Sequence, residues 1–577
     1  MKLTDALAKV LKKNNVSGVF GLQGGAVVHI FDSCEKFNLN VTYMHHEQSA
    51  SYAAVSCAKS SENISCVVVT TGPGATNAIT GLLSAWQDSV PVIFISGQAR
   101  SSHLSYGKKV RQVGTQEVNI CDIVKPITKK CFVISNKSDF QKNLEDAILI
   151  SKSGRPGPVW IDIPLEFQWA NIKYKKNLIL NKKTEPKKKI DFNKFYNLIK
   201  KSKKPLFVIG FGSRLSKGAG KIIYHLSKSK NIPLVTTWNA CDLFETSFNN
   251  NLGIIGMSGQ RGANKAIFNS DLLICLGTHL SIPHTTTLYE KYAPNAKKII
   301  VNIDDDQLKN LNVRFDLKIN SDVSFFLKRL SRNKIKSYNW HNEKNFKSLN
   351  WYYPKKSLKP NSNIFIRELC KKIKNKFCLV IDGGGTALYA GFQSSIVKKN
   401  CRIICSSAIS AMGTGLAETI GVYKSLKFKN IVTIIGDGSF LMNVQDLQSI
   451  KQDKILAKII VVNNNGYLAI RDTQKEFLNS KFYGTHPKWG LTIPSIKKIA
   501  KAFDIDYISV KSSTSVDRIT SLLAKKNKTI ICELFVDENQ TSLFKQGYKT
   551  ASNGIFIPQA LDEMFPFLDQ SIANTNN

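Results

Sequence analysis

A carboxylate and an amide follow two apolar segments in the last third of the chain, and together they could bind a cation. Asp437 lies between two glycines at the end of the apolar segment 431–435, and Asn464 lies in an asparagine run after the apolar segment 459–462. If both segments are parallel strands of one sheet, their carboxyl ends meet at one edge and bring the two side chains together. One carboxylate, one amide oxygen and a backbone carbonyl are oxygen ligands suited to Mg²⁺.

The residues around Asp437 indicate what such a cation would bind. Gly436, Gly438 and Ser439 are predicted to join a strand to the N-terminus of a helix, where backbone N–H groups and the helix dipole favour a phosphate. An Asp at that point would repel a phosphate unless a cation lay between them. The two strand ends therefore predict a diphosphate–Mg²⁺ site, and the alternative is a Gly-Asp-Gly turn beside a plain asparagine loop.

This segment resembles the diphosphate-binding motif of thiamine-diphosphate (ThDP) enzymes, and most of the chain resembles the large catalytic subunit of acetolactate synthase. The resemblance implies that Asp437, Asn464 and the carbonyl of Gly466 are the metal ligands. It also implies a set of residues that contact ThDP: Gly384, Thr386, Met412, Gly436, Gly438, Ser439 and Met442. Met412 would present its carbonyl to the aminopyrimidine ring and Met442 would hold the cofactor in its V shape, while filling a hydrophobic core is the alternative for both.

A second acid, Glu47, lies between a short predicted strand and a predicted helix of small residues. From the residues alone, an acid in the first turn of a helix is favoured by the helix dipole and needs no other role. The resemblance identifies Glu47 instead as the catalytic glutamate that hydrogen bonds to N1′ of the aminopyrimidine, while the cofactor supplies the electron sink. It also places Gly25 over the thiazolium ring and Gln116 near the reacting carbon, with a surface amide as the alternative for Gln116. The family usually has Pro where Gln23 stands.

Three α/β blocks are expected to position these residues. A strand at 66–70, a helix at about 76–86 and a strand at 92–96 predict a βαβ unit and hence a parallel sheet. The predicted fold class is α/β, with three doubly wound domains of the ThDP-enzyme type. Lysine-rich linkers are expected near 170–190 and 331–362. The predicted ranges are 1–170 for the pyrimidine-binding domain, 190–330 for a middle, flavin-binding-like domain, 363–550 for the diphosphate-binding domain and 551–577 for a C-terminal tail.

Two stretches depart from the family pattern. The family usually has two arginines after the strand that ends at Gly277, and arginines are natural partners of the FAD diphosphate. His279 and Pro283 stand there, so FAD binding is left open. Acetolactate synthases usually carry Trp where Thr473 stands, and this stretch is more similar to ThDP enzymes of nucleotide-sugar and surface-polysaccharide pathways. Arg471 is interpreted either as a ligand for a phosphate or carboxylate, or as a solvated surface residue.

The chain has 577 residues and a formal net charge of +39, which indicates either a polyanion partner or a lysine-rich composition. The lysines occur throughout the chain and their clearest clusters lie in the expected linkers. Compositional bias is therefore favoured, and no nucleic-acid partner is expected.

The twelve cysteines are scattered, form no C-x-x-C pair and often lie in apolar runs, which is typical of free thiols in a reducing compartment. The N-terminus has no signal-peptide pattern, and no apolar stretch approaches about 18 residues, the length of a membrane span. These features predict a cytoplasmic protein with no membrane partner.

Together these observations predict a ThDP- and Mg²⁺-dependent carboligase that decarboxylates pyruvate and joins the two-carbon unit to a second carbonyl. A 2-keto acid would give acetolactate, as in branched-chain amino acid biosynthesis, and a keto sugar in nucleotide-sugar or surface-polysaccharide biosynthesis is the alternative acceptor. A basic nucleic-acid-binding protein is a remote alternative. Because the family's site combines the glutamate of one chain with the diphosphate domain of another, the resemblance implies a homodimer or homotetramer. A regulatory small subunit is left open.

Overall fold

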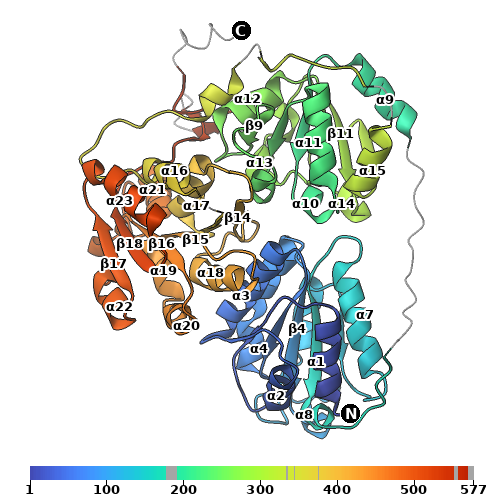
Figure 1. The fold of residues 1–577 in the computed structure, drawn as a ribbon. Helices are drawn as coiled ribbons and strands as arrows, with labels where there is room; N and C mark the ends of the chain where they lie inside the picture. Colours follow the sequence, from blue (N-terminus) through green and yellow to red (C-terminus); the bar gives the residue numbers. More distant parts are fainter. Residues whose placement is uncertain (177–190, 333–334, 343–344, 375, 551–555, 569–577) are drawn as a thin grey trace.

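The computed structural model describes residues 1–568 except 177–190, 333–334, 343–344, 375 and 551–555. Three sheets, each of six parallel strands, follow one another along the chain (Figure 1). Helices cover both faces of each sheet, as the right-handed crossover between parallel strands requires. The predicted α/β class with three doubly wound domains is confirmed.

The first sheet and its helices form the N-terminal domain. Val68 and Ile93 face α1, α2 and α7, whereas Val67 and Phe94 face α3 and α5, so both faces of the sheet are buried. Across the sheet the strands are β2 (Val41–Tyr43), β1 (Val19–Gly21), β3 (Ser65–Val69), β4 (Val92–Gln98), β6 (Val159–Pro164) and β5 (Cys131–Val133). The helices are α1 (Leu3–Lys13), α2 (Val28–Lys36), α3 (Glu47–Ser61), α4 (Pro73–Asn77), α5 (Ile79–Gln87), α6 (Ile120–Val124), α7 (Phe140–Lys152) and α8 (Leu165–Gln168).

The helix predicted at about 76–86 is divided into α4 and α5. At the junction, the Ala78 N–H donates to the carbonyl of Ala75 at 3.2 Å, which is a bond to the third residue back. The regular bond to the fourth residue back is lost there, so two helices replace the single predicted one.

The middle domain is built on the second sheet. Its strands are, in order across the sheet, β12 (Leu317–Asn320), β11 (Lys297–Asn302), β10 (Leu272–Leu276), β7 (Pro205–Ile209), β8 (Leu234–Thr236) and β9 (Asn251–Ile254). Its helices are α9 (Phe192–Lys201), α10 (Gly212–Leu215), α11 (Ala219–Lys230), α12 (Arg261–Asn269), α13 (Ile282–Thr285), α14 (Asp305–Lys309) and α15 (Val323–Leu330). The linker predicted near 170–190 lies mostly outside the described residues.

The C-terminal domain is built on the third sheet. Its strands are, in order across the sheet, β14 (Arg402–Ile404), β13 (Cys378–Ile381), β15 (Ile431–Gly436), β16 (Ala457–Asn463), β18 (Ile530–Phe535) and β17 (Asp506–Val510). Its helices are α16 (Ser362–Lys372), α17 (Gly385–Ser394), α18 (Gly415–Lys424), α19 (Asp437–Met442), α20 (Asp446–Gln452), α21 (Leu468–Phe477), α22 (Ile496–Ala502) and α23 (Val516–Lys525).

One hydrophobic core continues from the first sheet to the third through α3 and α18, which lie side by side (Figure 1). The small residues of α3 make this approach possible, because α3 is packed between its own sheet and α18. A Cβ at Gly421 of α18 would lie 1.9 Å from the carbonyl oxygen of Ala53. The two helix backbones are therefore in direct contact, which a larger side chain at Gly421 would prevent.

The segment predicted as a tail contributes two short strands in its described part. The antiparallel pairs are β19 (Lys545–Gln546) with β22 (Met564–Phe565), and β20 (Tyr548–Thr550) with β21 (Phe556–Pro558). Met564 is buried beside Phe544, whereas Phe565 and Phe567 are exposed, so the segment packs against the rest of the chain through only some of its apolar residues.

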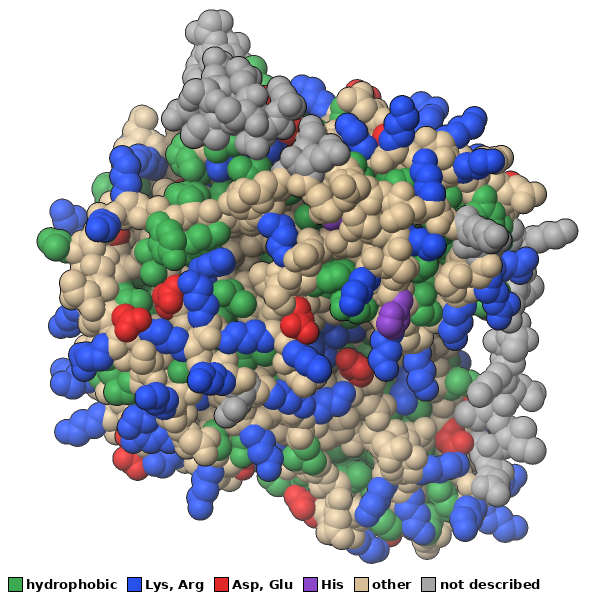
Figure 2. Space-filling view, turned by 45° about the horizontal axis from the view of Figure 1, so that its top comes forward, with side chains coloured by type: hydrophobic (Ala, Val, Ile, Leu, Met, Phe, Trp, Pro, Cys, Tyr) green, Lys and Arg blue, Asp and Glu red, His purple; other side chains and the backbone are tan. Residues whose placement is uncertain are grey.

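Lys and Arg side chains are scattered over the whole face drawn in Figure 2, with fewer Asp and Glu among them. On this face they form no separate basic stripe. Within the described residues, no helix is both long and apolar enough to cross a bilayer.

Candidate active site

The carboxyl ends of β15 and β16 lie next to each other, with Gly436 opposite Val462 in the parallel register. Asp437 begins α19 directly after β15, and its buried carboxylate accepts two backbone hydrogen bonds. The N–H of Gly438 donates to Oδ1 at 2.8 Å and the N–H of Gly466 donates to Oδ2 at 3.0 Å. The structure therefore brings Asp437 and Gly466 together at the edge of the sheet where the two strands end.

Asn464 lies at the same edge and has an acceptor with no partner. Its Nδ2 donates to Oγ1 of Thr386 at 3.3 Å, whereas its buried Oδ1 has no hydrogen bond among the described residues. Leaving such a group unpaired costs about 1–3 kcal/mol. Burial also raises the pKa of Asp437 to about 6, although its backbone hydrogen bonds and the charge of Arg471 act against this. An amide oxygen without a partner beside a buried carboxylate is a donor set that fits Mg²⁺.

Within the described part of the chain, no three His, Cys, Asp or Glu side chains group as metal ligands. A metal at this edge would thus depend on amide and carbonyl oxygens as well as on one carboxylate. This composition suits a hard cation such as Mg²⁺ better than zinc.

Glycines next to this edge leave room that a side chain would fill. A Cβ at Gly384 would lie 2.5 Å from Cγ of Met412 and 2.9 Å from Oγ of Ser439. Gly413 has φ +80°, and a Cβ there would lie 2.7 Å from Cβ of Met442. The structure therefore brings Gly384, Met412 and Ser439 into one group, with Met442 beside them. Met442 is 48% exposed, so the alternative of a core-filling methionine does not hold for it.

Asp382 belongs to this group and was missed in the sequence. It follows β13, is fully buried, and accepts backbone hydrogen bonds from Gly384 at 3.1 Å and Gly415 at 3.0 Å. It thereby ties the loop after β13 to the first residue of α18. The signal was present, because Asp382 directly follows an apolar strand and precedes glycines, much as Asp437 does.

Arg471 is not the solvated surface residue of one sequence interpretation, although it lines a cavity of about 420 Å³. It is 5% exposed, and its Nη atoms donate to four backbone carbonyls at 2.8–3.0 Å. Those carbonyls belong to Asn464, Asn465, Thr485 and Glu538. Arg471 therefore holds the backbone of the loop that carries the predicted metal ligands.

Glu47 is the first residue of α3 and is 6% exposed. Its Oε2 accepts a hydrogen bond from Nδ2 of Asn77 at 3.0 Å. A Cβ at Gly74 would lie 3.3 Å from Oε1 of Glu47 and 2.7 Å from Thr70, whose side chain also contacts Gly24. The glycine loop, the loop after β3 and Glu47 thus form one group, in which Asn77 orients the carboxyl.

Gly25 and Gln116 lie at the exposed rim of this group. Nothing lies within 4 Å of a Cβ built on Gly25. Gln116 adopts φ +59°, and its carbonyl accepts a hydrogen bond from Oγ1 of Thr71 at 3.1 Å. Its backbone is thus held while its side chain is open to solvent, so the structure does not bring it against Glu47.

The N-terminal and C-terminal groups meet within one chain at Gln48. Its Oε1 accepts a hydrogen bond from Nδ2 of Asn443 at 3.3 Å, and Asn443 also donates to the carbonyl of Gly413 at 2.9 Å. Residues adjacent to Glu47 and to Met442 are therefore in contact.

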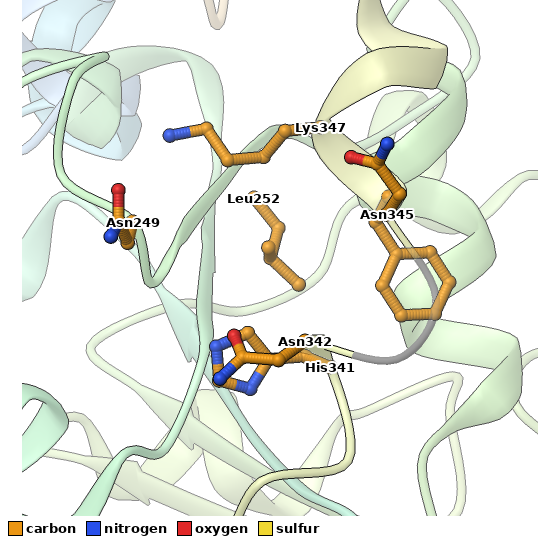
Figure 3. A pocket seen from close by; sticks show the side chains of 7 residues that line it. Asn249, Leu252, His341, Asn342, Asn345 and Lys347 are labelled. Atoms are coloured by element: carbon orange, nitrogen blue, oxygen red, sulfur yellow. The ribbon is translucent and has the colours of Figure 1, made fainter.

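The middle domain holds a separate cavity of about 170 Å³ (Figure 3). The residues lining it are Asn249, Leu252, His341, Asn342, Asn345, Phe346 and Lys347. None of them belongs to either group described above. The ammonium of Lys347 donates to the carbonyls of Thr246 and Phe248, so its charge is already engaged.

Family models for thiamine pyrophosphate enzymes match the chain three times in succession. The N-terminal TPP binding domain matches residues 1–123, the central domain residues 192–330 and the C-terminal TPP binding domain residues 383–533. Both groups of candidate residues lie within or directly beside the two TPP binding matches.

Curated relatives match over nearly the full chain. The acetolactate synthase large subunit of Haemophilus influenzae is 28% identical over 558 residues, which are 93% of this chain and 94% of that protein. The acetolactate synthase large subunit of Cyanidium caldarium is 31% identical over 548 residues, covering 89% and 90%. The acetolactate synthase isozyme 2 large subunit of Escherichia coli is 27% identical over 539 residues, covering 92% and 94%.

Proposed function

The chain belongs to the thiamine pyrophosphate enzyme family that includes the acetolactate synthase large subunits, and from this premise we propose that it is a ThDP- and Mg²⁺-dependent carboligase. It decarboxylates pyruvate and joins the two-carbon unit to a second 2-keto acid, giving acetolactate. The observation that carries the proposal is the buried, unpartnered Oδ1 of Asn464 beside the carboxylate of Asp437. That pair suits a cation, and a cation at a helix N-terminus beside a glycine loop suits a diphosphate.

The C-terminal group would hold the anionic end of the cofactor. Asp437, Asn464 and the carbonyl of Gly466 would hold Mg²⁺, while backbone N–H groups at the start of α19 would face the diphosphate. Arg471 donates to the carbonyls of Asn464 and Asn465, and so holds the backbone from which the proposed ligands project. Gly384 leaves room for the cofactor next to Met412 and Ser439.

The N-terminal group would act on protons. Glu47 would exchange a proton with the aminopyrimidine ring, and the hydrogen bond from Asn77 orients its carboxyl for that purpose. When bound, ThDP supplies the electron sink for the electron pair that remains when the pyruvate carboxylate leaves as CO₂. Burial of Glu47 at 6% exposure excludes water that would compete for this proton.

The working unit in this proposal is a homodimer with its sites between subunits. The exposed rim at Gly25, the open side chain of Gln116 and the 48% exposure of Met442 support it, because each site group presents an uncovered face. Co-expression of Glu47→Gln chains with Asp437→Asn chains tests this arrangement. Hybrid dimers would then contain one intact site, restoring about a quarter of wild-type activity at random pairing. No restoration would place both groups of each site in one chain.

The proposed carboligase does not bind FAD. His279 and Pro283 follow β10 where the family usually has arginines, so neither position offers a guanidinium to a flavin diphosphate. The carbonyl of Pro283 is already engaged, because it accepts the N–H of Met257 at 2.8 Å. Flavin bands in the absorbance spectrum of the purified protein would contradict this exclusion.

A keto sugar is the second candidate acceptor. Thr473, where acetolactate synthases usually carry Trp, is exposed, and its hydroxyl donates to the carbonyl of Ala469 at 3.4 Å. A small side chain there leaves space for an acceptor bulkier than a 2-keto acid.

The experiment that tests the function incubates the purified protein with pyruvate, ThDP and Mg²⁺. Acetolactate is converted to acetoin by acid and measured by colour, and CO₂ release is followed in parallel. Acetoin from pyruvate alone supports the keto-acid acceptor. CO₂ release that requires an added keto sugar supports the second candidate, and the absence of both products contradicts both.

A further inference from the structure

The end of β4 contacts the loops of the N-terminal group. A Cβ at Gly97 would lie 1.8 Å from the carbonyl oxygen of Ala26, so β4 is in direct contact with the loop that follows Gly25. The next residue, Gln98, is the last of β4 and is fully buried. Its side-chain amide joins two further loops, which are the loop after β3 and the loop that carries Gln116.

Gln98 connects the two ends of the loop at 107–117. Its Nε2 donates to Oη of Tyr106 at 3.1 Å and to the carbonyl of Val118 at 2.8 Å, and these two residues flank the loop. Tyr106 also donates to that carbonyl, at 3.1 Å. The loop contains no helix or strand, and residues 107–113 are exposed. Hydrogen bonds at its two ends therefore fix where it leaves the domain and where it returns.

The loop is also held at Gln116 itself. Oε1 of Gln98 accepts the hydroxyl of Thr71 at 2.7 Å, and that hydroxyl lies 3.1 Å from the carbonyl oxygen of Gln116. A Cβ at Gly72 would lie 2.4 Å from the same carbonyl oxygen. The backbone of Gln116 is thus packed against the loop after β3, and one hydroxyl joins it to Gln98.

The orientation of the Gln98 amide follows from its partners. Oε1 accepts the N–H of Ala99 at 2.9 Å, and Nε2 donates to Oδ2 of Asp162 at 3.0 Å. An N–H only donates and a carboxylate only accepts, so the reversed amide would lose both hydrogen bonds. Asp162 is fully buried in β6, and its Oδ1 accepts the hydroxyl of Ser96 in β4. The sheet therefore fixes the amide, and the amide holds the loop.

We propose that Gln98 is a positioning residue for the carboligase reaction, because its amide closes the base of the loop at 107–117 and so sets the place of Gln116. The inference rests on the proposed function and on the resemblance that places Gln116 near the reacting carbon. Gln98 is fully buried and acts on the substrate only through this loop. Misplacing a group at the reacting atoms by about 1 Å costs on the order of 100-fold in rate, so loss of the amide should be visible in turnover.

The first test compares Gln98→Met with Gln141→Met. Methionine keeps the length of the side chain but makes none of the amide hydrogen bonds. Gln141 is the matched control, because it is a buried amide in α7 of the same domain and donates to the carbonyl of Lys175 at 2.7 Å, in a segment without candidate site residues. In Gln98→Met, kcat/KM for pyruvate should fall by about 10–100-fold, whereas ThDP affinity should change little. In Gln141→Met both should stay near wild type while the melting temperature falls.

The split between kcat/KM for pyruvate and ThDP affinity separates positioning from a general loss of structure. An unchanged kcat/KM in Gln98→Met would overturn the proposal, and so would an equal fall in both variants. A joint loss of ThDP affinity and kcat/KM in Gln98→Met would give Gln98 a merely structural role and would overturn it as well.

Thr71→Val is the second variant, and it carries the test if thermal melts show that Gln98→Met does not fold. It keeps the shape of the side chain and removes the hydroxyl shared by Gln98 and the carbonyl of Gln116. In this variant kcat/KM for pyruvate should fall as well. The loss in the double variant should be smaller than the product of the two single losses, because both act on the same loop. Losses that multiply would contradict a shared role.

The order of the loop has its own measurement, which does not require catalysis. The N–H groups of Val113 and Glu117 donate to acceptors within the loop, so their hydrogen exchange reports how well the loop is ordered. Exchange should be severalfold faster in Gln98→Met than in the wild type and unchanged in Gln141→Met. Equal exchange in the wild type and both variants would overturn the proposal. A wild type that releases no CO₂ from pyruvate contradicts the proposed function instead, and the exchange rates still test whether Gln98 holds the loop.

Discussion

The two halves of the candidate site differ in how far one chain completes them. In the C-terminal half, Asp437 accepts two backbone hydrogen bonds and Arg471 holds four carbonyls of the surrounding loops. In the N-terminal half, Glu47 is oriented by Asn77, but Gly25 and the side chain of Gln116 face open space. The half that would anchor the cofactor is preorganised within the chain, whereas the half that would act on protons is open on one side.

The difference between the two halves of the candidate site has a physical reason. Oxygen ligands for a metal must be held at fixed separations, so their loop needs internal hydrogen bonds before the cation arrives. A group that exchanges a proton must reach its partner, and the open side leaves space for cofactor, substrate and a second subunit. Four variants test this division of roles, and they are ordered by the expected effect on turnover.

The largest effect is expected for Glu47→Gln. Without the proton-exchanging carboxyl, turnover should fall by about 10²–10⁴-fold, the range for loss of a general acid–base group. ThDP affinity, measured by fluorescence titration, should change little because the C-terminal half is intact. Glu35→Gln, at an exposed site of the same domain, is the control. Unchanged turnover in Glu47→Gln would mean that another acid serves the ring.

A smaller effect is expected for Asn464→Ala, which removes the unpartnered oxygen. Loss of one charge-assisted contact of about 1.5–3 kcal/mol should weaken Mg²⁺-dependent ThDP binding by about 10–150-fold. Turnover at saturating cofactor should stay closer to wild type than in Glu47→Gln. Asn464→Asp keeps an oxygen ligand and should bind better than Asn464→Ala. Equal binding by the two variants would remove Asn464 from the metal site.

A third effect is expected for Arg471→Met, which removes the hydrogen bonds that hold the loop of Asn464. Its carbonyl partners would lose their donor, so ThDP affinity should fall by about tenfold, in the range for residues that position metal ligands. The melting temperature should fall as well, since buried carbonyls are left unpaired. Arg471→Lys restores one donor group, so its ThDP affinity and melting temperature should lie between those of the wild type and of Arg471→Met. A change in KM for pyruvate alone, with cofactor affinity intact, would instead make Arg471 a substrate residue.

The smallest effect on turnover is expected for Asp446→Asn, at the boundary between the halves. Asp446 begins α20 and faces Ser49 of α3, and burial raises its pKa to about 7. A carboxyl whose pKa is raised by folding makes stability fall as pH rises from the unfolded pKa, about 4, to the folded pKa, about 7, and the loss stays constant above that. Between pH 4 and pH 7, the free energy of unfolding of the variant should therefore rise relative to that of the wild type, by up to a few kcal/mol. Denaturant unfolding at several pH values measures the difference, and parallel curves for both proteins would contradict it.

Much of the architecture could be predicted from local sequence. The strands predicted at 66–70 and 92–96 lie at β3 and β4, because short β-branched runs bounded by turn residues form buried parallel strands with little help from distant residues. The break between α4 and α5 at Ala78 could not be predicted, since nothing in the residue types there opposes a helix.

The sequence by itself determined which oxygens lie at the ends of β15 and β16, because strand period and parallel topology place Asp437 and Asn464 at one edge whatever else the chain does. Only the tertiary structure decided the partners of the long and buried side chains. The burial of Arg471 against four carbonyls depends on loops up to 67 residues away, and the approach of α18 to α3 joins segments of the first and third domains. Such contacts depend on packing between distant segments, which the pattern of neighbouring residues does not encode.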